Sequence, residues 1–536
     1  MTSSRAPSQP SVARYLLPSV QDVVFLVAFW AILAGPLSTR PLADADIGWH
    51  IRTGEQILAT HAVPRTDPFS STMQGQPWFA WEWLYDLLLG IVHSTMGLNG
   101  VVWMAALVIA TTFALLFRAL LKRGTGMPVT VLLWLLALGG ASIHLFSRPH
   151  IASWLLTLLW FIALERWEQG SAPSWLRWFF PLSMILWANL HGGWIFGMTL
   201  FAVYIAASWI EGLRGEDAIT RILCRQRSRS MLWAFLLSAL ATLVNPYGWR
   251  LHAHISGYLG DSYLMSRIAE FRSPDFHGTG QRCYVAILVL VLIAFAVGRS
   301  RIRVSQWLVV PLVAYAGVYA ARNLPISSML LALIAGPRLW AGVVNLAERP
   351  VAWRTLRSLS AWAANFHRRA GDQELNLRGH LWPAAGVVAA LAVCLHGGRL
   401  GSQNVVHAQF DAKHLPVGAV DFLQKESSTQ PVFGPDQWGG YLIYRLYPQR
   451  QVVIDDRHDL YGANRFREYD VLMQGQPGWR DVLDRWHLQT LVLPVDSTLA
   501  NLLHEIPQEW QVVHEGPVAV VIERKGTGQA SLMRQL

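Results

Sequence analysis

The fold is decided by an uncharged apolar run that reads Val101-Val-Trp-Met-Ala-Ala-Leu-Val-Ile-Ala-Thr-Thr-Phe-Ala-Leu-Leu-Phe117. Together with its flanks, residues 99–121, it is long enough to cross the hydrocarbon core of a bilayer as a helix. Backbone polar groups find no water there, so a crossing segment must be helical. Similar segments recur at 22–38, 128–145, 150–165, 178–190, 193–211, 231–245, 283–298, 304–320, 323–337 and 381–397.

The composition is typical of a protein that is solvated largely by lipid. Of the 536 residues, 53% are hydrophobic and 15% are charged, whereas soluble domains carry about 25% charged residues. The net charge of +10 comes from basic residues spread over short connections, without the basic patch of a nucleic-acid-binding protein. We therefore predict an α-helical polytopic membrane protein with about eleven transmembrane helices, and no nucleic-acid partner.

The basic residues also predict the orientation. If the N-terminus is cytoplasmic, Lys122-Arg123, the Arg-rich segment 211–230 and the segment 338–380 all lie on the cytoplasmic side, as the positive-inside rule requires. We expect a multi-pass protein of the cell inner (plasma) membrane. The three cysteines, Cys224, Cys283 and Cys394, show no CxxC spacing, so neither a disulfide framework nor a thiolate metal site is expected.

The chain divides near residue 400. Over 1–400 we predict a transmembrane domain with a large first outer loop, 39–81, followed by an interfacial helix, 82–95, which has one apolar face. Over 401–536, short β-branched runs such as 451–455 alternate with helical ones. This alternation predicts a soluble α/β domain on the extracytoplasmic side.

Unusual polar residues gather at the outer face of the membrane in this topology. Ionisable groups at membrane depth are costly and usually functional, so their convergence predicts an outward-facing site. They are Asp44, Asp46 and His50 in the first loop, then Arg148, His150, Asn189, His191, Asn245, Arg322 and Asn323 at the ends of later helices.

Simpler interpretations of these residues stay open. Asp46 precedes a predicted helix over 47–59 and could only cap it, and Asn245 could only end a helix. Arg148 and Arg322 could anchor helix ends at the lipid headgroups.

The C-terminal domain offers candidates for binding an acceptor. Asp455 and Arg457 lie at the end of the predicted strand 451–455, where open α/β sheets bind ligands, although a solvated loop would explain them too. Trp438 and Tyr441 could stack on a sugar ring, or could pack their own helix.

Several of these motifs resemble a known family. Asp44-Ala-Asp-Ile-Gly-Trp-His50, Val63-Pro-Arg-Thr-Asp-Pro-Phe-Ser70 and Glu82-Trp-Leu84 are similar to the first-loop signature of poorly characterised prokaryotic membrane proteins related to the GT-C superfamily of glycosyltransferases. The likeness spans most of the chain and includes Trp187-Ala-Asn-Leu-His-Gly-Gly193, Asn245-Pro-Tyr-Gly248, Ala321-Arg-Asn323, Trp438-Gly-Gly-Tyr441 and Ile454-Asp-Asp-Arg457.

The resemblance implies an enzyme that moves a sugar from a polyprenyl-phosphate donor to an extracytoplasmic glycan, lipid or protein, and it points to Asp44 and Asp46 as catalytic acids. Such a reaction needs a base for the acceptor and cations for the leaving phosphate. Asp46 suits the first role, and Arg148 and Arg322 suit the second because guanidinium binds phosphate bidentately. His50 lies on the same helical face as Asp46. Asp44, Asp46 and His50 could also hold a divalent cation, Mg²⁺ or Mn²⁺, and no other cofactor is expected.

Two alternatives without catalysis stay open, a non-catalytic GT-C-like subunit of a membrane assembly and a transporter of lipid-linked glycans. A transporter usually has polar groups deep in its helices, and the predicted spans are nearly free of them. The enzyme is therefore favoured, with membrane lipid and the sugar donor as its partners.

Overall fold

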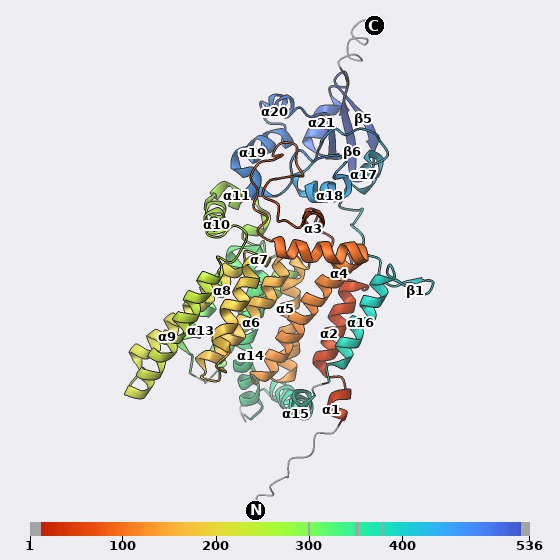
Figure 1. Ribbon diagram of the computed structural model, residues 1–536. Coiled ribbons are helices and arrows are strands. Elements are labelled where there is room, and N and C mark those ends of the chain that lie inside the picture. Colours follow the sequence, from red (N-terminus) through yellow and green to blue (C-terminus); the bar gives the residue numbers. More distant parts are fainter. Residues whose placement is uncertain (1–11, 299–300, 349–352, 378, 527–536) are drawn as a thin grey trace, which may run out of the picture.

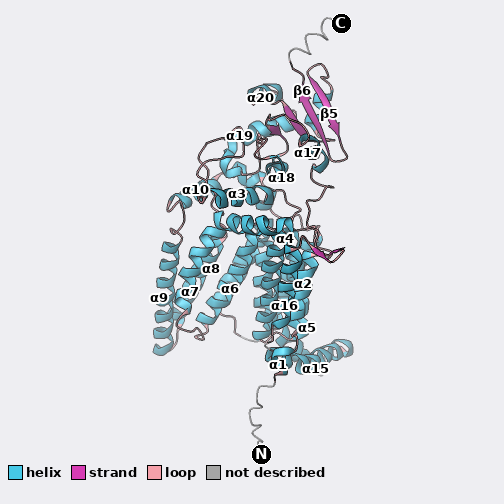
Figure 2. Cartoon of the chain, turned by 45° about the vertical axis from the view of Figure 1, so that its right-hand side comes forward, coloured by secondary structure: helices cyan, strands magenta, loops and turns pink. Residues whose placement is uncertain are grey.

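The structure is a computed structural model that describes residues 12–298, 301–348, 353–377 and 379–526. Figure 1 shows a bundle of helices and, beyond one end of it, a smaller part that contains a sheet. Figure 2 shows the same two layers from a second side. The bundle consists of α2 (Val20–Leu33), α4 (Trp83–Lys122), α5 (Met127–Ala141), α6 (His150–Glu168), α7 (Leu176–Leu190), α8 (Trp194–Arg214), α9 (Ala218–Ala241), α12 (Thr279–Val297), α13 (Val304–Tyr319), α14 (Leu324–Glu348) and α16 (Leu381–Leu395).

Each predicted apolar segment is helical over most of its length. Length and composition, however, identify fewer membrane crossings than there are apolar helices. Six stretches among the described residues are long and apolar enough to span a membrane. A seventh is added if the bent pair of α15 (Arg354–Asn376) and α16 counts as one span. Helices α7 and α13 have only 15 and 16 residues. The structure therefore confirms a mostly helical membrane protein, and eleven crossings stay a prediction.

Helix α4 changes direction at Gly97. This residue has φ 59° and ψ −150°, a conformation that residues with a Cβ rarely adopt. The part before the kink, 83–96, lies across the end of the bundle, and the part after it, 98–122, runs down inside (Figure 1). The first part coincides with the interfacial helix predicted over 82–95.

The C-terminal part contains a four-stranded sheet in the order β3 (Val432–Phe433), β4 (Thr490–Pro494), β6 (Ala519–Arg524) and β5 (Trp510–Glu515). Strand β3 is parallel to β4, and the other neighbours are antiparallel. The helices of this part are α17 (Val417–Leu423), α18 (Asp436–Leu446), α19 (His458–Met473), α20 (Trp479–Arg485) and α21 (Thr498–His504). The small C-terminal sheet region is thereby confirmed, while the domain boundary at residue 401 stays a prediction.

The strand predicted over 451–455 is wrong. Val452 forms only isolated bridges, one to Val432 and one to Ser70 of the first loop. Its N–H donates to the carbonyl of Phe69 at 3.1 Å, and its own carbonyl accepts from Ser71 at 2.8 Å. The segment therefore connects the first outer loop to the C-terminal sheet instead of extending a ladder.

The first loop is part of the C-terminal layer. Its helix α3 (Ile47–Thr60) packs on α18 so closely that a Cβ on Gly48 would lie 2.2 Å from the carbonyl oxygen of Gly440. Nearby, Arg457 and Asp67 form an ion pair of 2.8 Å whose side chains are at most 1% exposed. Removal of one partner of a buried ion pair strongly destabilises the folded protein. The first loop and the segment around Arg457 therefore depend on each other for stability.

We expect Gly48→Ala to separate α3 from α18, because overpacking typically costs about 1–3 kcal/mol. The melting temperature in detergent should fall, and proteolysis of the first loop should become faster. Gly257→Ala is the matched control, since a Cβ there meets nothing within 4 Å. Equal behaviour of the two variants would contradict the close approach.

The orientation across the membrane can be tested by cysteine labelling. We expect Thr60→Cys to react with an impermeant maleimide on intact cells and Arg225→Cys to react only after permeabilisation, because the basic connections should face the cytoplasm. Both are made in a background without Cys224, Cys283 and Cys394. Labelling of position 225 on intact cells would reverse the orientation.

Candidate active site

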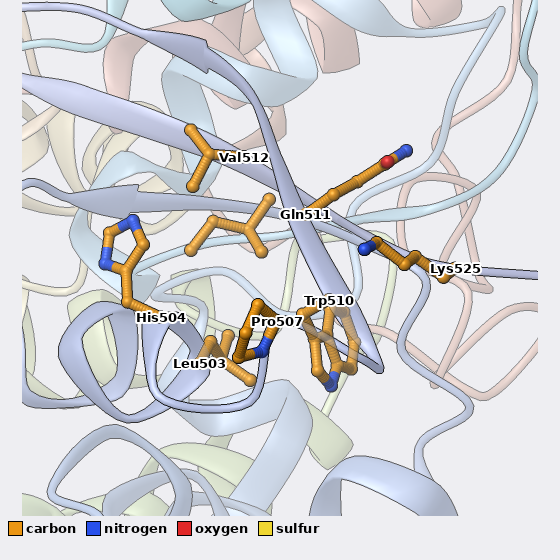
Figure 3. A pocket seen from close by; sticks show the side chains of 8 residues that line it. Leu503, His504, Pro507, Trp510, Gln511, Val512 and Lys525 are labelled. Carbon is orange, nitrogen blue, oxygen red and sulfur yellow. The ribbon is translucent and has the colours of Figure 1, made fainter. Parts of the chain in front are cut away.

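A cavity of about 1020 Å³ lies between the bundle and the C-terminal part. Its walls come from the first loop, the starts of α4, α6 and α8, the second outer loop (residues 247–282), the segment 319–326, and residues 456–459. A smaller hollow of about 170 Å³ lies beside β5, where Figure 3 shows His504, Trp510 and Lys525 around it. Since no carboxylate and none of the predicted site residues line the smaller hollow, the large cavity is the candidate site.

Arg148 joins three carboxylates in this cavity. Its guanidinium lies 2.8 Å from Asp44, 3.0 Å from Asp46 and 2.8 Å from Glu270. Asp44 also accepts a hydrogen bond from the backbone N–H of Asp46 at 3.0 Å. Two predicted acids and one predicted cation therefore meet, although Arg148 already has three anionic partners.

Asp46 does not cap α3. Its backbone is helical, with φ −56° and ψ −31°, and its side chain makes no capping hydrogen bond. Instead the side chain lines the cavity and is nearly buried. Burial raises the pKa of Asp46 to about 7, although Arg148 acts in the opposite direction. The capping interpretation is excluded by this geometry.

Asp456 faces Asp46 from the C-terminal part. Burial, together with the negative charge of Asp46, raises the pKa of Asp456 well above its usual range. The charge of each carboxylate disfavours ionisation of the other. Asp456 lies in the motif Ile454-Asp-Asp-Arg457, but no role was predicted for it.

A second group surrounds Glu82, the residue before α4. One of its carboxylate oxygens lies 3.9 Å from Nε2 of His50, and the other lies 3.7 Å from Nε2 of His191. Nδ1 of His50 is hydrogen-bonded to Asp86 at 2.6 Å. His50 therefore lies next to Glu82 and Asp86. Its position on the helical face had predicted that it would lie next to Asp46.

Arg322 is a cation of the cavity that can still bind an anion. It lies in the turn η3 (Ala321–Asn323), lines the cavity and stacks on Phe271 at 4.4 Å. No ion pair of Arg322 occurs among the described residues. Next to it, Asn323 and the exposed Arg272 also line the cavity. Across the cavity, Nε2 of His150 is hydrogen-bonded to the carbonyl of His144 at 2.9 Å.

Two of the predicted asparagines support the backbone and do not line the cavity. Asn189 accepts a hydrogen bond from the indole of Trp83 at 2.7 Å and donates to Val244. Asn245 holds its own turn, where it accepts from the N–H of Tyr247 and donates to Gly248. The helix-stop interpretation therefore fits Asn245 better than binding does.

The predicted acceptor residues are also used in packing. Trp438 and Tyr441 are buried in α18, with their polar atoms bonded to the carbonyl of His414 and to Arg445. Asp455 is fully buried and binds Arg457 at 2.7 Å. Arg457 reaches the cavity wall, but it is held by two carboxylates and stacks on Trp78 at 4.7 Å. The geometry does not support sugar stacking at Trp438 or Tyr441.

The predicted metal ligands do not form a metal site. His50 is bonded to Asp86, and the guanidinium of Arg148 occupies the place between Asp44 and Asp46 where a cation would bind. Within the described part of the chain, no three His, Cys, Asp or Glu side chains are grouped to hold a metal ion. The residues present therefore do not fit Mg²⁺ or Mn²⁺.

No protein-family model and no curated protein matches the sequence. Among solved structures, the apo oligosaccharyltransferase of Archaeoglobus fulgidus is similar with a TM-score of 0.55 and 9% identity, over 89% of this chain and 70% of that chain. Apo ArnT from Cupriavidus metallidurans has a TM-score of 0.47 and 15% identity, over 94% of this chain and 97% of that chain. The first similarity confirms the predicted likeness to GT-C glycosyltransferases at the level of fold.

Proposed function

We propose that this chain is a membrane glycosyltransferase that moves a sugar from a polyprenyl-phosphate donor to an acceptor outside the cytoplasm. The observation that carries the proposal is the carboxyl pair Asp46 and Asp456, which lies in a cavity at the end of the membrane bundle with Arg148 and Arg322 near it. The fold shared with an oligosaccharyltransferase supports the same reaction class. The membrane is taken to be the inner membrane, with the cavity facing outward.

Asp46 is the general base in this proposal. A carboxylate whose pKa lies near the working pH takes a proton efficiently and still exists in the ionised form. Arg148 keeps part of the Asp46 population ionised, while Asp44 and Glu270 hold the guanidinium in place. As Asp46 takes the proton of the acceptor hydroxyl, the acceptor oxygen bonds to the anomeric carbon of the sugar, and the bond from that carbon to the phosphate oxygen breaks, so that polyprenyl phosphate leaves. Asp456 keeps its own proton and hydrogen-bonds to Asp46. This assigns Asp44 a positioning role.

The donor phosphate is assigned to the side of the cavity around Arg322. A guanidinium that already binds three carboxylates has little capacity for a phosphate, so Arg322 and Arg272 replace Arg148 as phosphate ligands. Apolar residues of the same cavity, such as Phe196, Leu259 and Ile326, would contact the prenyl chain. The aromatic rings of Trp49, Trp78 and Trp81 form the wall for the sugar and acceptor.

No step of the proposal passes through a divalent cation. The charge that a metal would provide next to Asp44 and Asp46 is already provided by Arg148. His150 and His191 line the site, and His191 lies beside Glu82. Asn323 is assigned a place beside the phosphate. Its amide donates a hydrogen bond to the carbonyl of Ala316, which fixes the turn that carries Arg322.

We expect Asp46→Asn and Asp46→Ala to lose glycosyl transfer by about 10²–10⁴-fold, because neither side chain accepts a proton. The rate of the wild-type enzyme, measured as release of polyprenyl phosphate from membranes supplied with polyprenyl-phosphate sugars, should fall as the pH drops below about 7. The carboxylate form is then lost. Asp46→Asn keeps the size of the side chain and should change the melting temperature little, whereas Asp46→Ala also removes a partner of Arg148 and should lower it.

Asp217 provides the matched control, because its side chain does cap α9 by accepting from the N–H of Thr220. There, Asn should be neutral and Ala should lower the melting temperature, with activity kept in both. An active Asp46→Asn enzyme would exclude Asp46 as the base. Absence of transfer in the wild type with every polyprenyl-phosphate sugar would favour the non-catalytic alternatives.

Arg322→Lys keeps the charge but loses the fork that binds two phosphate oxygens. We expect the KM for the donor to rise about tenfold or more, which corresponds to one lost charge-assisted hydrogen bond, while the melting temperature is kept. Arg250→Lys is the control, because Arg250 is an exposed outer residue away from the cavity. Equal KM values in both variants would remove Arg322 from the phosphate site.

A further inference from the structure

One carboxyl of the cavity has no part in the proposed reaction, and its surroundings differ from those of Asp46. Glu82 lines the cavity, and its side chain is 12% exposed. Among the described residues, no Arg or Lys comes within salt-bridge distance of it, and only two histidines lie near its oxygens. A buried carboxylate without a cationic partner is unfavourable, so this position favours the neutral acid.

Both histidines are held with their Nε2 atoms toward Glu82. His191 accepts a hydrogen bond at Nδ1 from the backbone N–H of Gly193 at 3.0 Å, so in its neutral form it carries its proton on Nε2. The ring of His50 is fixed from behind by Asp86 and is stacked on Trp49 at 3.6 Å. Its Nε2 is fully buried and has no hydrogen-bond partner. An unpartnered buried nitrogen that points toward Glu82 is a second indication of a ligand-binding site at this side of the cavity.

Glu82 and Arg322 line the same cavity, and Arg322 is among the charges that act on Glu82. Burial raises the pKa of Glu82 to about 8, and Asp459 and Asp46 act in the same direction. Arg148 and Arg322 act against this increase. Burial lowers the pKa of both His50 and His191 well below its usual range, so neither supplies a positive charge. With Asp86, these are the titratable and charged groups that face Glu82.

We propose that Glu82 binds the donor phosphate as a neutral hydrogen-bond donor, and that its ionisation above neutral pH expels the donor from the cavity. A carboxylic acid kept neutral in an apolar site can donate a hydrogen bond to an oxyanion. The ionised form would place a second negative charge against the phosphate. The inference deepens the proposed function and rests on it, because it assumes a phosphodiester beside Arg322.

The role assigned to His50 is that of a positioning residue. With Asp86 behind it and Trp49 beneath it, the ring limits where the Glu82 carboxyl can turn. Its neutral form adds no charge that would stabilise ionised Glu82. The site therefore keeps Glu82 protonated by excluding cations from its immediate neighbourhood, while Arg322 supplies the charge that attracts the phosphate.

The test measures binding and does not depend on turnover. The probe is a short prenyl methyl phosphate, a phosphodiester whose single negative charge does not change from about pH 6 to about pH 9. Its Kd is measured on the purified full-length chain. Because only the protonated enzyme binds, the Kd of the wild type should rise about tenfold per pH unit above about pH 8.

Glu82→Gln keeps the size, the neutral charge and an N–H donor, so it should bind the probe as the wild type does at neutral pH, with no rise in Kd at alkaline pH. Glu82→Ala should bind weakly at every pH. Glu55→Gln is the matched control, because Glu55 is paired with Arg52 and His93 outside the cavity, and it should keep the wild-type pH dependence.

The outcomes separate the two proposals. A wild-type Kd that does not change with pH, or a rise that persists in Glu82→Gln, would overturn the role of Glu82 while leaving the proposed glycosyl transfer intact. No binding of the probe at any pH would overturn the phosphodiester donor, and this inference with it. The wild-type measurement needs no variant, so a Glu82→Gln protein that fails to fold does not prevent the test.

Discussion

The arrangement of the cavity depends on one half-buried guanidinium, that of Arg148. Arg148 holds Asp44 and Asp46 from the first loop and Glu270 from the second outer loop, so three separate segments are fixed by a single side chain. Three carboxylates against one cation leave an excess of negative charge in a region of low dielectric, where like charges raise each other's pKa. Burial is the main reason why the pKa values of Asp46, Asp456 and Glu82 are raised, and nearby carboxylates act in the same direction. The contacts of Arg148 thus bear on both the architecture and the chemistry of the site.

The second constraint is the contact between the first loop and the C-terminal part. Gly48 and Gly440 allow two helices to approach each other at backbone distance, and Arg457 binds Asp67 in the interior. This contact brings residue 456 over a cavity that is otherwise formed by the bundle and its outer loops. The C-terminal part that contains the small sheet therefore also supplies a wall of the candidate site.

The sequence predicted what depends on local pattern. The apolar runs located the helices, and the break near Gly97 was anticipated by separating 82–95 from 99–121. The assignment of Asp46 to a site rests on its position and on the family likeness, and it stays a prediction. Features that depend on distant pairing were missed or wrong. Residues 451–455 look like a strand until they pair with Phe69 and Ser71, and Trp438 looks exposed until α3 covers α18. Asp456 and Glu82 lie in motifs of the family likeness, but no local pattern assigns a role to either, because their partners are far away in the chain.

The position of Asp456 has a consequence for biosynthesis. The cavity begins with residue 46 and is not closed until residue 456 has emerged, so a nascent chain passes through insertion of its whole helical bundle with an unfinished site. Domains fold as units while synthesis proceeds, and here a segment far along the chain completes a cavity that starts at the first loop. A ribosome that stalls after the bundle would leave a chain that lacks Asp456, one of the two facing carboxyls. The chain order thereby delays the assembly of the site until residue 456 has been synthesised.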